Sequence, residues 1–358
     1  MFQGSGDQLR DRRYRLRAGL RSVTLQASCA TCGDPISLGV LVGIRTDGRA
    51  VVQGTRHCKR VWLCPVCSAV IRHVRAQEIE TALTRHLDAG GGALFVTATM
   101  PHDFGDALAP LVVAINDAHR AMTNGRAWFE PIYGDRDRYG VMGTIKAVEV
   151  THGCNGWHPH LHSLMCTCAE LDLVEIGGLA QSMFDRYASS IERSGYRRPS
   201  PTVGLVVAGV SSKGVAGYVA KVDDGGSLGS ELSRIDLKRA TASHRTPFEV
   251  LAYAIEDDFQ AVELWQEYEE SIGGVNSLRW SPGLRARLGI ASVSDDEVMR
   301  QAEVIDRSKG SLLLDRWEWW HVRSRGLEGV LLDVMESAGV TGVLSMIASL
   351  MGESRRVA

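Results

Sequence analysis

The residues best suited to chemistry lie in the stretch WHPHLHSLM, residues 157–165, which places three histidines at alternate positions. In an extended strand alternate side chains point to the same face, so these imidazoles share one side. Same-face neighbours are about 6.6 Å apart at their α-carbons, which lets two rings bind one metal ion. Pro159 suits only the start or the edge of a strand. The pattern therefore favours His160 and His162 as the metal-binding pair, with Leu161 on the opposite, apolar side.

Other interpretations of the three histidines remain open. A histidine cluster with a purely structural role would have the same spacing, and so would the zinc site of a hydrolase. Three imidazoles within five residues favour a ligand set. Imidazole alone identifies neither the metal nor the reaction, so a second motif is needed.

That second motif is GYVAK, residues 217–221. If this segment is helical, Tyr218 and Lys221 are three residues apart and share a face. The phenol has an unperturbed pKa of about 10, and a nearby cation or metal ion would favour the phenolate. Such a tyrosine could attack a phosphodiester. A Tyr-x-x-Lys pair by itself is common on surface helices and assigns nothing.

Together with a third segment, ALFVTATMPH at residues 93–102, these motifs resemble those of the HUH endonuclease superfamily, specifically of rolling-circle replication initiators (Rep proteins) of actinobacterial plasmids. The segment 93–102 looks like the family's first motif. VEVTH at 148–152 and the histidine stretch look like the second, and the tyrosine segment looks like the third. Their order and spacing agree, and the resemblance covers most of the chain.

The resemblance implies a nickase that cuts single-stranded or hairpin origin DNA by transesterification. Mg²⁺ or Mn²⁺ held by His160, His162 and a third ligand would polarise the scissile phosphate, and His158 would support the metal site or contact DNA. Tyr218 would attack, leaving a free 3′-hydroxyl and a covalent 5′-phosphotyrosine linkage, while Lys221 would orient or neutralise the phosphate. The sequence has no GxxxxGK[ST] motif, so unwinding would need a host helicase.

The third ligand is predicted from a β-hairpin. A strand over 141–152 turns through Gly153-Cys154-Asn155-Gly156 into the histidine strand. A hairpin centred on this turn places Glu149 opposite His160 or His162, so its carboxylate is the candidate ligand. The alternative is an ordinary surface carboxylate on a strand.

One position departs from the family pattern. In some plasmid initiators of this broad family a glutamate four residues before the tyrosine activates water to end the round, whereas here that position is Gly214. Termination would then need another carboxylate or the tyrosine of a second protomer in a homodimer. Three other functions remain open: an HUH single-strand transposase or relaxase, a metallohydrolase that does not use Tyr218, and a non-catalytic zinc-containing DNA-binding regulator.

The cysteines indicate a second metal site. CATC at 29–32 and CPVC at 64–67 are two C-x-x-C pairs separated by 31 residues. No apolar run approaches 18 residues and no signal-peptide pattern is present, so we expect a cytoplasmic protein with no membrane partner. In a reducing cytosol the pairs indicate a structural Zn²⁺ rather than disulfides. The predicted ligands are Cys29, Cys32, Cys64 and Cys67, with Cys58 as a possible substitute; four buried thiols are the alternative.

Three further cysteines have no such spacing and are expected to be packing residues: Cys154, Cys166 and Cys168. Two short strands, 40–44 and 50–53, are predicted around a turn at 46–48 between the two C-x-x-C pairs.

The charge of the chain is polarised, although the net charge is only −2. Residues 1–75 contain 13 Lys and Arg against 4 Asp and Glu, whereas residues 249–304 contain 4 against 12. A basic N-terminal part is typical of a polyanion-binding protein. We expect DNA contacts from its densest part, or alternatively a solvated tail; the residues concerned are Arg10, Arg12, Arg13, Arg15 and Arg17.

The remaining periodicities predict an α+β protein. Strand 93–100, helix 107–122, the two hairpin strands, helix 171–193 and strand 203–210 give the order βαββαβ of a ferredoxin-like, split βαβ antiparallel sheet, here of the HUH endonuclease type. The predicted segments are a basic N-terminal arm at 1–28, a zinc-binding module at 29–75, an endonuclease domain at 76–232 and a mostly helical C-terminal region at 233–358.

Within residues 233–358 the sequence supports two further predictions, one about tryptophans and one about a helix pair. Core packing is favoured over base stacking for Trp317, Trp319 and Trp320, and residues 327–351 predict a helix pair broken at Gly339.

Overall fold

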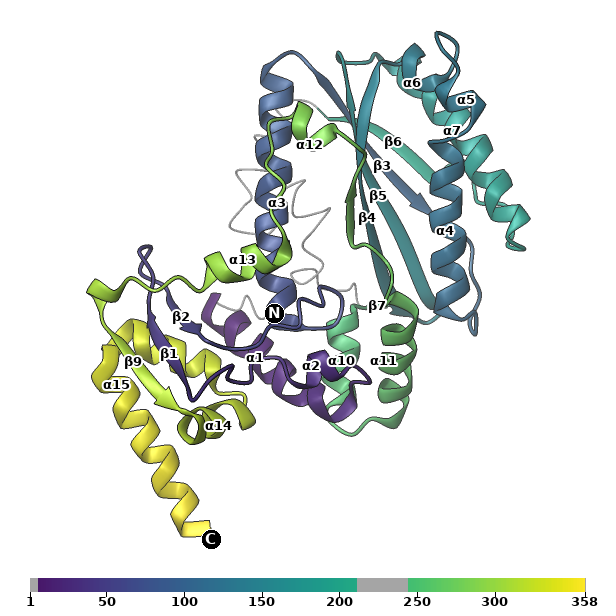
Figure 1. Cartoon of the computed structure of the whole chain (residues 1–358). Coiled ribbons are helices and arrows are strands. Elements are labelled where there is room, and N and C mark those ends of the chain that lie inside the picture. Colours follow the sequence, from purple (N-terminus) through teal and green to yellow (C-terminus); the bar gives the residue numbers. More distant parts are fainter. Residues whose placement is uncertain (1–5, 211–243, 358) are drawn as a thin grey trace. The chain divides into compact units, whose positions relative to one another are not determined.

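The computed structural model describes residues 6–210 and 244–357, so Gly214, Tyr218 and Lys221 lie outside the described residues (Figure 1). The chain divides into two compact units. The first consists of Met1–Ile71, Val250–Glu269 and Val293–Ala358, and the second of Arg72–Glu249 and Glu270–Ser292. The region predicted as a separate C-terminal part, 233–358, is thus divided between the two units.

The second unit contains the predicted βαββαβ order. Its elements are β3 (Gly92–Thr99), α4 (Leu108–Met122), β4 (Val141–Gly153), β5 (Gly156–Thr167), α7 (Leu173–Arg193) and β6 (Leu205–Val210), with the short helices α5 (Arg126–Phe129) and α6 (Asp135–Arg138) before β4. The strands form one antiparallel sheet in the order β6-β3-β5-β4-β7, where β7 is His244–Arg245, and β8 (Leu278–Trp280) also pairs with β4. The antiparallel α+β prediction is therefore confirmed.

The two faces of this sheet carry different helices (Figure 1). On one face, Ile145 of β4 and Leu164 of β5 are fully buried against Ile79 and Leu83 of α3 (Pro65–Asp88), and α12 (Leu284–Arg287) joins the same core. α4 and α7 cover the other face. Both helices are amphipathic, and α7 begins with a capping box in which Asp172 and Glu175 bind each other's backbone N–H groups.

The first unit is built on a small antiparallel sheet in the order β2-β1-β9. The predicted hairpin is present as β1 (Gly39–Ile44) and β2 (Ala50–Gln53), and β9 (Ser311–Asp315) adds a third strand from a region predicted to be mostly helical. Its core lies between this sheet and the helices α14 (Arg316–Ser324) and α15 (Glu328–Val357). The other elements are α1 (Gly6–Val23), α2 (Ala27–Ala30), α10 (Pro247–Ala254), α11 (Phe259–Ile272), α13 (Asp295–Ala302) and the 3₁₀-helix η2 (Arg307–Lys309).

α15 is interrupted as the sequence predicts. Gly339 has φ 62° and ψ −158°, so the element consists of two helices joined by a kink. Among the described residues, Glu328–Gly352 has the length and hydropathy of a membrane span. Both halves nevertheless contribute side chains to the core, including Leu331 from the first and Val343 from the second.

Candidate functional site

The histidine strand is β5, and it lies between β3 and β4. His160 pairs with Glu149 of β4, and His162 pairs with Thr97 of β3. Directly opposed residues of neighbouring strands share a face, so the predicted ligands all project from one side of the sheet. Leu161 is fully buried on the other side, as predicted.

Glu149 and His162 are in direct contact. Glu149 Oε2 lies 3.3 Å from His162 Nε2, and their side chains are only 11% and 12% exposed. Thr97 Oγ1 lies 3.3 Å from the other ring nitrogen of His162, which fixes the orientation of that ring. The ring of His160 is parallel to that of His162, with the centroids 6.4 Å apart. The hairpin register therefore brings together Glu149, His160 and His162, the three ligands that the sequence predicts.

These residues suit a divalent cation in their donor chemistry. A carboxylate with two imidazoles is a donor set that binds divalent metals. Neighbouring ligands of an octahedral ion at about 2.1 Å are about 3 Å apart, which is close to the spacing of the Glu149 and His162 atoms. An ion there would also compensate the charge of Glu149, whose residue is 9% exposed.

His158 has a different environment. Its Nδ1 lies 2.5 Å from Nε2 of His102, and its ring meets that of His160 edge-on at 3.9 Å. The ring of His244, in β7, is 6.3 Å away. Burial, followed by the charges of His102 and His244, lowers the pKa of His158 to about 4 despite Glu149. His158 is therefore neutral at pH 7 and can accept or donate a hydrogen bond, or bind a metal.

Sequence reasoning had assigned no role to His102 or His244. His102 is the last residue of the 93–102 segment, so its position beside the motif was a usable signal. His244 follows the histidine strand by about 80 residues and enters the cluster because β7 pairs with the end of β4 at His152. No local pattern predicts that pairing.

A second candidate site is formed by four cysteines in the first unit. Their sulfur atoms all lie within 4.8 Å of one another, and they belong to Cys32, Cys58, Cys64 and Cys67. Three of the sulfur–sulfur distances are 3.7, 3.7 and 3.8 Å. A tetrahedron with zinc–sulfur bonds of about 2.3 Å has edges of about 3.8 Å. The group therefore matches a structural zinc site in residue type and spacing.

The fourth member of this group is Cys58 and not Cys29. Cys29 is fully buried, and its interaction with Cys58 is the largest cause of the raised pKa of the Cys58 thiol. The group that could bind zinc therefore contains Cys58, the possible substitute in the sequence prediction, in place of Cys29. Hydrogen bonds from the other three thiols, that of Cys58 being the strongest, lower the pKa of Cys32 and favour a thiolate there.

Helix α14 hydrogen-bonds to the backbone at Cys32 and Gly33, at the end of the first C-x-x-C pair. The indole N–H of Trp319 donates to the carbonyl of Gly33 at 2.9 Å, and Arg323 donates to the carbonyl of Cys32 at 2.8 Å. Trp319 is buried, as predicted. Trp317 and Trp320 are 57% and 49% exposed and stack on each other at 5.2 Å, so core packing was the wrong expectation for these two.

The basic N-terminal segment is a packed helix, which excludes the solvated tail. Arg10 pairs with Glu336 at 2.6 Å and also contacts Asp333. Arg17 is buried and pairs with Glu328 at 2.6 Å. These two arginines are therefore engaged within the protein. Arg12 and Arg15 are exposed, as a DNA contact requires, and Arg13 is half-buried.

The three remaining cysteines differ in environment. Cys166 is fully buried in the core of the second unit, as expected of a packing residue. Cys154, in the hairpin turn, and Cys168, after β5, are exposed, so the packing prediction was wrong for them.

Comparison with known proteins gives two relatives, and no family model or solved structure matches. The chain is 35% identical over 153 residues to the "Neomycin resistance protein" of Streptomyces cyanogenus, which covers 37% of this chain and 35% of that protein. It is 32% identical over 314 residues to the "Protein rep" of Streptomyces lividans, which covers 72% of this chain and 69% of that protein. This likeness includes most of both sequences, and the chain therefore belongs to the family of the Streptomyces lividans Rep protein.

Proposed function

We propose that the protein initiates rolling-circle replication of a plasmid by nicking one strand of origin DNA and becoming attached to the new 5′ end. The name of the Streptomyces lividans relative supports a role in replication. The observation that carries the nicking chemistry is the contact of Glu149 with His162, beside His160 on the central strand.

The proposed reaction is a single transesterification. Bound Mg²⁺ or Mn²⁺ would polarise the scissile phosphodiester and offset its charge. The phenol oxygen of Tyr218 attacks phosphorus and loses its proton, while the bond to the 3′-oxygen breaks and that oxygen takes up a proton. One phosphoester replaces another, so no nucleotide is consumed. Lys221 neutralises the phosphate, and Glu149 would be the third ligand of the metal beside His160 and His162.

Chain length supports the participation of Tyr218, which lies outside the described residues. Val210 ends β6 opposite Ala93, and His162 lies opposite Thr97 of the same strand β3. Four residues along a strand are about 13 Å and two strand spacings are about 10 Å, so Val210 and His162 are roughly 16 Å apart. Tyr218 follows Val210 by eight residues, which can span about 26 Å.

A covalent adduct tests the proposal. The full chain is incubated with Mn²⁺ and single-stranded oligonucleotides that are labelled at their 3′ ends and tiled across the DNA on both sides of its gene, because the fragment downstream of the nick is the one that stays on the protein. We expect a labelled protein band that resists denaturation and disappears in Tyr218→Phe. The matched control is Tyr133→Phe, because Tyr133 is 78% exposed and lies away from the histidine strand in sequence.

Two outcomes would contradict the proposal. Cleavage by Tyr218→Phe at the wild-type rate would indicate a metal-dependent hydrolase. Binding of the oligonucleotides without any cleavage or adduct, in Mg²⁺ and in Mn²⁺, would indicate a DNA-binding regulator.

A further inference from the structure

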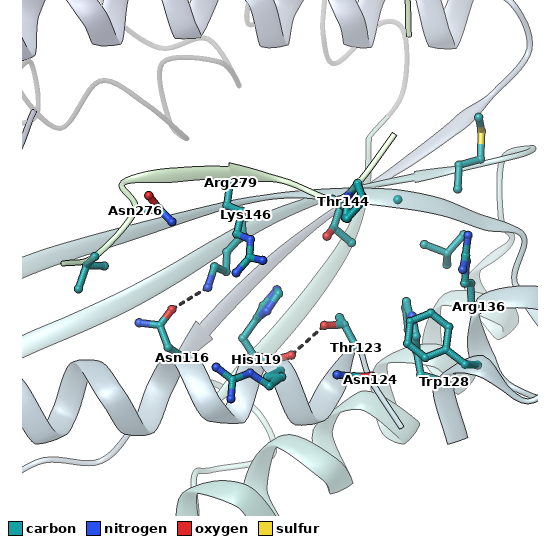
Figure 2. Close-up of a pocket in the computed structure, with 18 of the residues that line it drawn as sticks. Asn116, His119, Thr123, Asn124, Trp128, Arg136, Thr144, Lys146, Asn276 and Arg279 are labelled. Carbon is teal, nitrogen blue, oxygen red and sulfur yellow. Dashed lines mark hydrogen bonds between the residues drawn. The ribbon is translucent and has the colours of Figure 1, made fainter. Parts of the chain in front are cut away.

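A separate pocket lies in the second unit, on the face of the sheet opposite the histidines (Figure 2). Lys146 of β4 lines it, whereas its neighbours Ile145 and Ala147 point into the core beside α3. The pocket is bounded by α4, by α5 and α6, and by the segment 274–282 that carries β8. Its volume is about 630 Å³, within the range of small-molecule sites and well above the size of a phosphate ion.

The lining of this pocket is cationic. No aspartate or glutamate is among the residues that line it in the part of the chain that the structure describes. Four charged side chains reach the pocket from four different elements, and a histidine lies among them. These residues are Arg120 and His119 of α4, Arg136 of α6, Lys146 of β4 and Arg279 of β8. Their mutual repulsion would be relieved by a bound anion.

His119 gives an independent indication of a ligand. Its residue is 92% buried, since only 8% is exposed, and its Nε2 atom has no hydrogen-bond partner among the described residues. A buried polar atom without a partner costs free energy, and a ligand that hydrogen-bonds to this nitrogen would remove that cost. Burial, then the charges of Lys146 and Arg279, lowers the pKa of His119 to about 3. The ring is therefore neutral and can still donate or accept one hydrogen bond in the pocket.

Lys146 is the best-placed cation. Its Nζ donates to Oδ1 of Asn116 at 2.6 Å, as Figure 2 shows, and the other two ammonium hydrogens remain available to a ligand. Burial, then the charges of Arg279 and Arg120, lowers the pKa of Lys146 to about 8. A phosphate beside this amine would restore its full charge and form charge-assisted hydrogen bonds.

The rest of the lining suits a base and a sugar. Trp128 and Phe129 supply aromatic surface, and Phe129 is 50% exposed. Asn124 and Asn276 supply amides that can pair with the edge of a base. We infer that this pocket binds a nucleoside phosphate, with the phosphate between Lys146 and Arg279 and the base toward the aromatic side chains. The ligand is either a free nucleotide or a nucleotide within a single DNA strand.

Calorimetric titration of the full chain with deoxyadenosine 5′-monophosphate tests this inference. Arg279 is exposed, so Arg279→Gln should fold normally, and we expect it to weaken binding at least 10-fold. Lys146→Gln should have a similar effect. Arg193→Gln is the matched control, because Arg193 is an exposed arginine at the end of α7 and is not among the lining residues. Its affinity should stay within twofold of the wild type.

Three further titrations identify the recognised groups. Deoxyadenosine and inorganic phosphate should each bind at least 10-fold more weakly than the nucleotide. A tetranucleotide without a terminal phosphate distinguishes the two sources. If the protein binds the tetranucleotide more tightly than the mononucleotide, and Arg279→Gln weakens both equally, the ligand is a DNA strand. If the protein binds the tetranucleotide more weakly, the ligand is a free nucleotide. Equal affinity for deoxyadenosine and its monophosphate, or an unchanged Arg279→Gln, would overturn the inference.

A pH series provides a second measurement that does not depend on the variants folding. Affinity should fall as the pH rises from 7 to 9.5, because Lys146 loses its proton in that range while the arginines stay charged. The groups that face Lys146 are Asn116, His119 and Arg120 from α4 and Arg279 from β8, and none of these changes its protonation over this range. A flat profile would contradict a phosphate beside Lys146.

Discussion

The identity of the fourth cysteine ligand can be tested by two single substitutions. Cys58 and Cys29 are both candidates by sequence, but the sulfur of Cys58 completes the group in which Cys32, Cys64 and Cys67 lie at tetrahedral spacing. We expect Cys58→Ser to weaken zinc binding strongly, because an alcohol oxygen is a poor replacement for a thiolate. Cys29→Ser should leave the zinc content at one ion per chain.

The size of the effect follows from the number of ligands. Structural zinc sites bind with about 10–16 kcal/mol, so each of four ligands contributes about 2.5–4 kcal/mol. Loss of one ligand should therefore raise the dissociation constant by about 10²- to 10³-fold, at 1.4 kcal/mol per factor of ten. Competition with a chromophoric chelator measures this constant, and thermal unfolding of the same samples should show a lower midpoint for Cys58→Ser.

The opposite pattern would refute the reasoning. If Cys29→Ser lost its zinc while Cys58→Ser retained it, the two C-x-x-C pairs alone would form the site. If the wild-type protein contained no zinc, the cysteines would be buried thiols. Because Cys29 is fully buried, its serine variant is expected to lose some stability, and the zinc content rather than the unfolding midpoint is the deciding measurement.

Three other predictions concern the second unit and the N-terminal helix. Glu149→Gln keeps the shape of the side chain but removes its charge, so we expect the rate of adduct formation to fall at least 100-fold and to be partly restored by a higher Mn²⁺ concentration. An unchanged rate would exclude Glu149 as a ligand. Glu328→Gln leaves the buried Arg17 without its anion and should lower the free energy of unfolding by about 3–5 kcal/mol in urea titrations. Loss of the more exposed Arg15–Asp11 pair should lower it by less than about 1 kcal/mol, and equal effects of the two changes would show that burial of the Arg17 pair is unimportant. The pKa of His119 is lowered to about 3 in the folded protein, so the unfolded chain binds the additional proton as the pH falls below about 6.5, and stability should decrease by roughly 1.4 kcal/mol per pH unit from there toward pH 3. His119→Asn should remove that part of the pH dependence, and an identical slope in both proteins would contradict the assignment.

Local periodicity was sufficient to predict the hairpin that carries the histidines. Alternation of side chains in β4 and β5 fixes which residues share a face, and a turn through Cys154 and Asn155 fixes the register. For that reason Glu149 could be placed opposite His160 or His162 from the sequence, and the structure pairs it with His160. The antiparallel order of the sheet followed from the same reasoning, because short connections and helical periods leave few topologies.

Several of the predictions that failed depend on packing that no local pattern shows. Charge density in residues 10–17 does not reveal that Arg17 meets a carboxylate 311 residues later. The spacing of the cysteines identifies the two C-x-x-C pairs, but it does not reveal that Cys58 rather than Cys29 joins the other three. Aromatic residues at 317–320 look equivalent in sequence, but only Trp319 faces the core, since the helix turns its neighbours outward.

The pairing of β1 with β9 has a consequence for how the chain matures. Gly39 is opposite Asp315, so the small sheet joins segments that leave the ribosome at very different times. Contacts of such large sequence separation form late and slowly, because a long loop must close before they are made. A transcript with a premature stop before residue 311 would yield a product whose strand β1 has an unpaired edge, open to association with other unfinished chains.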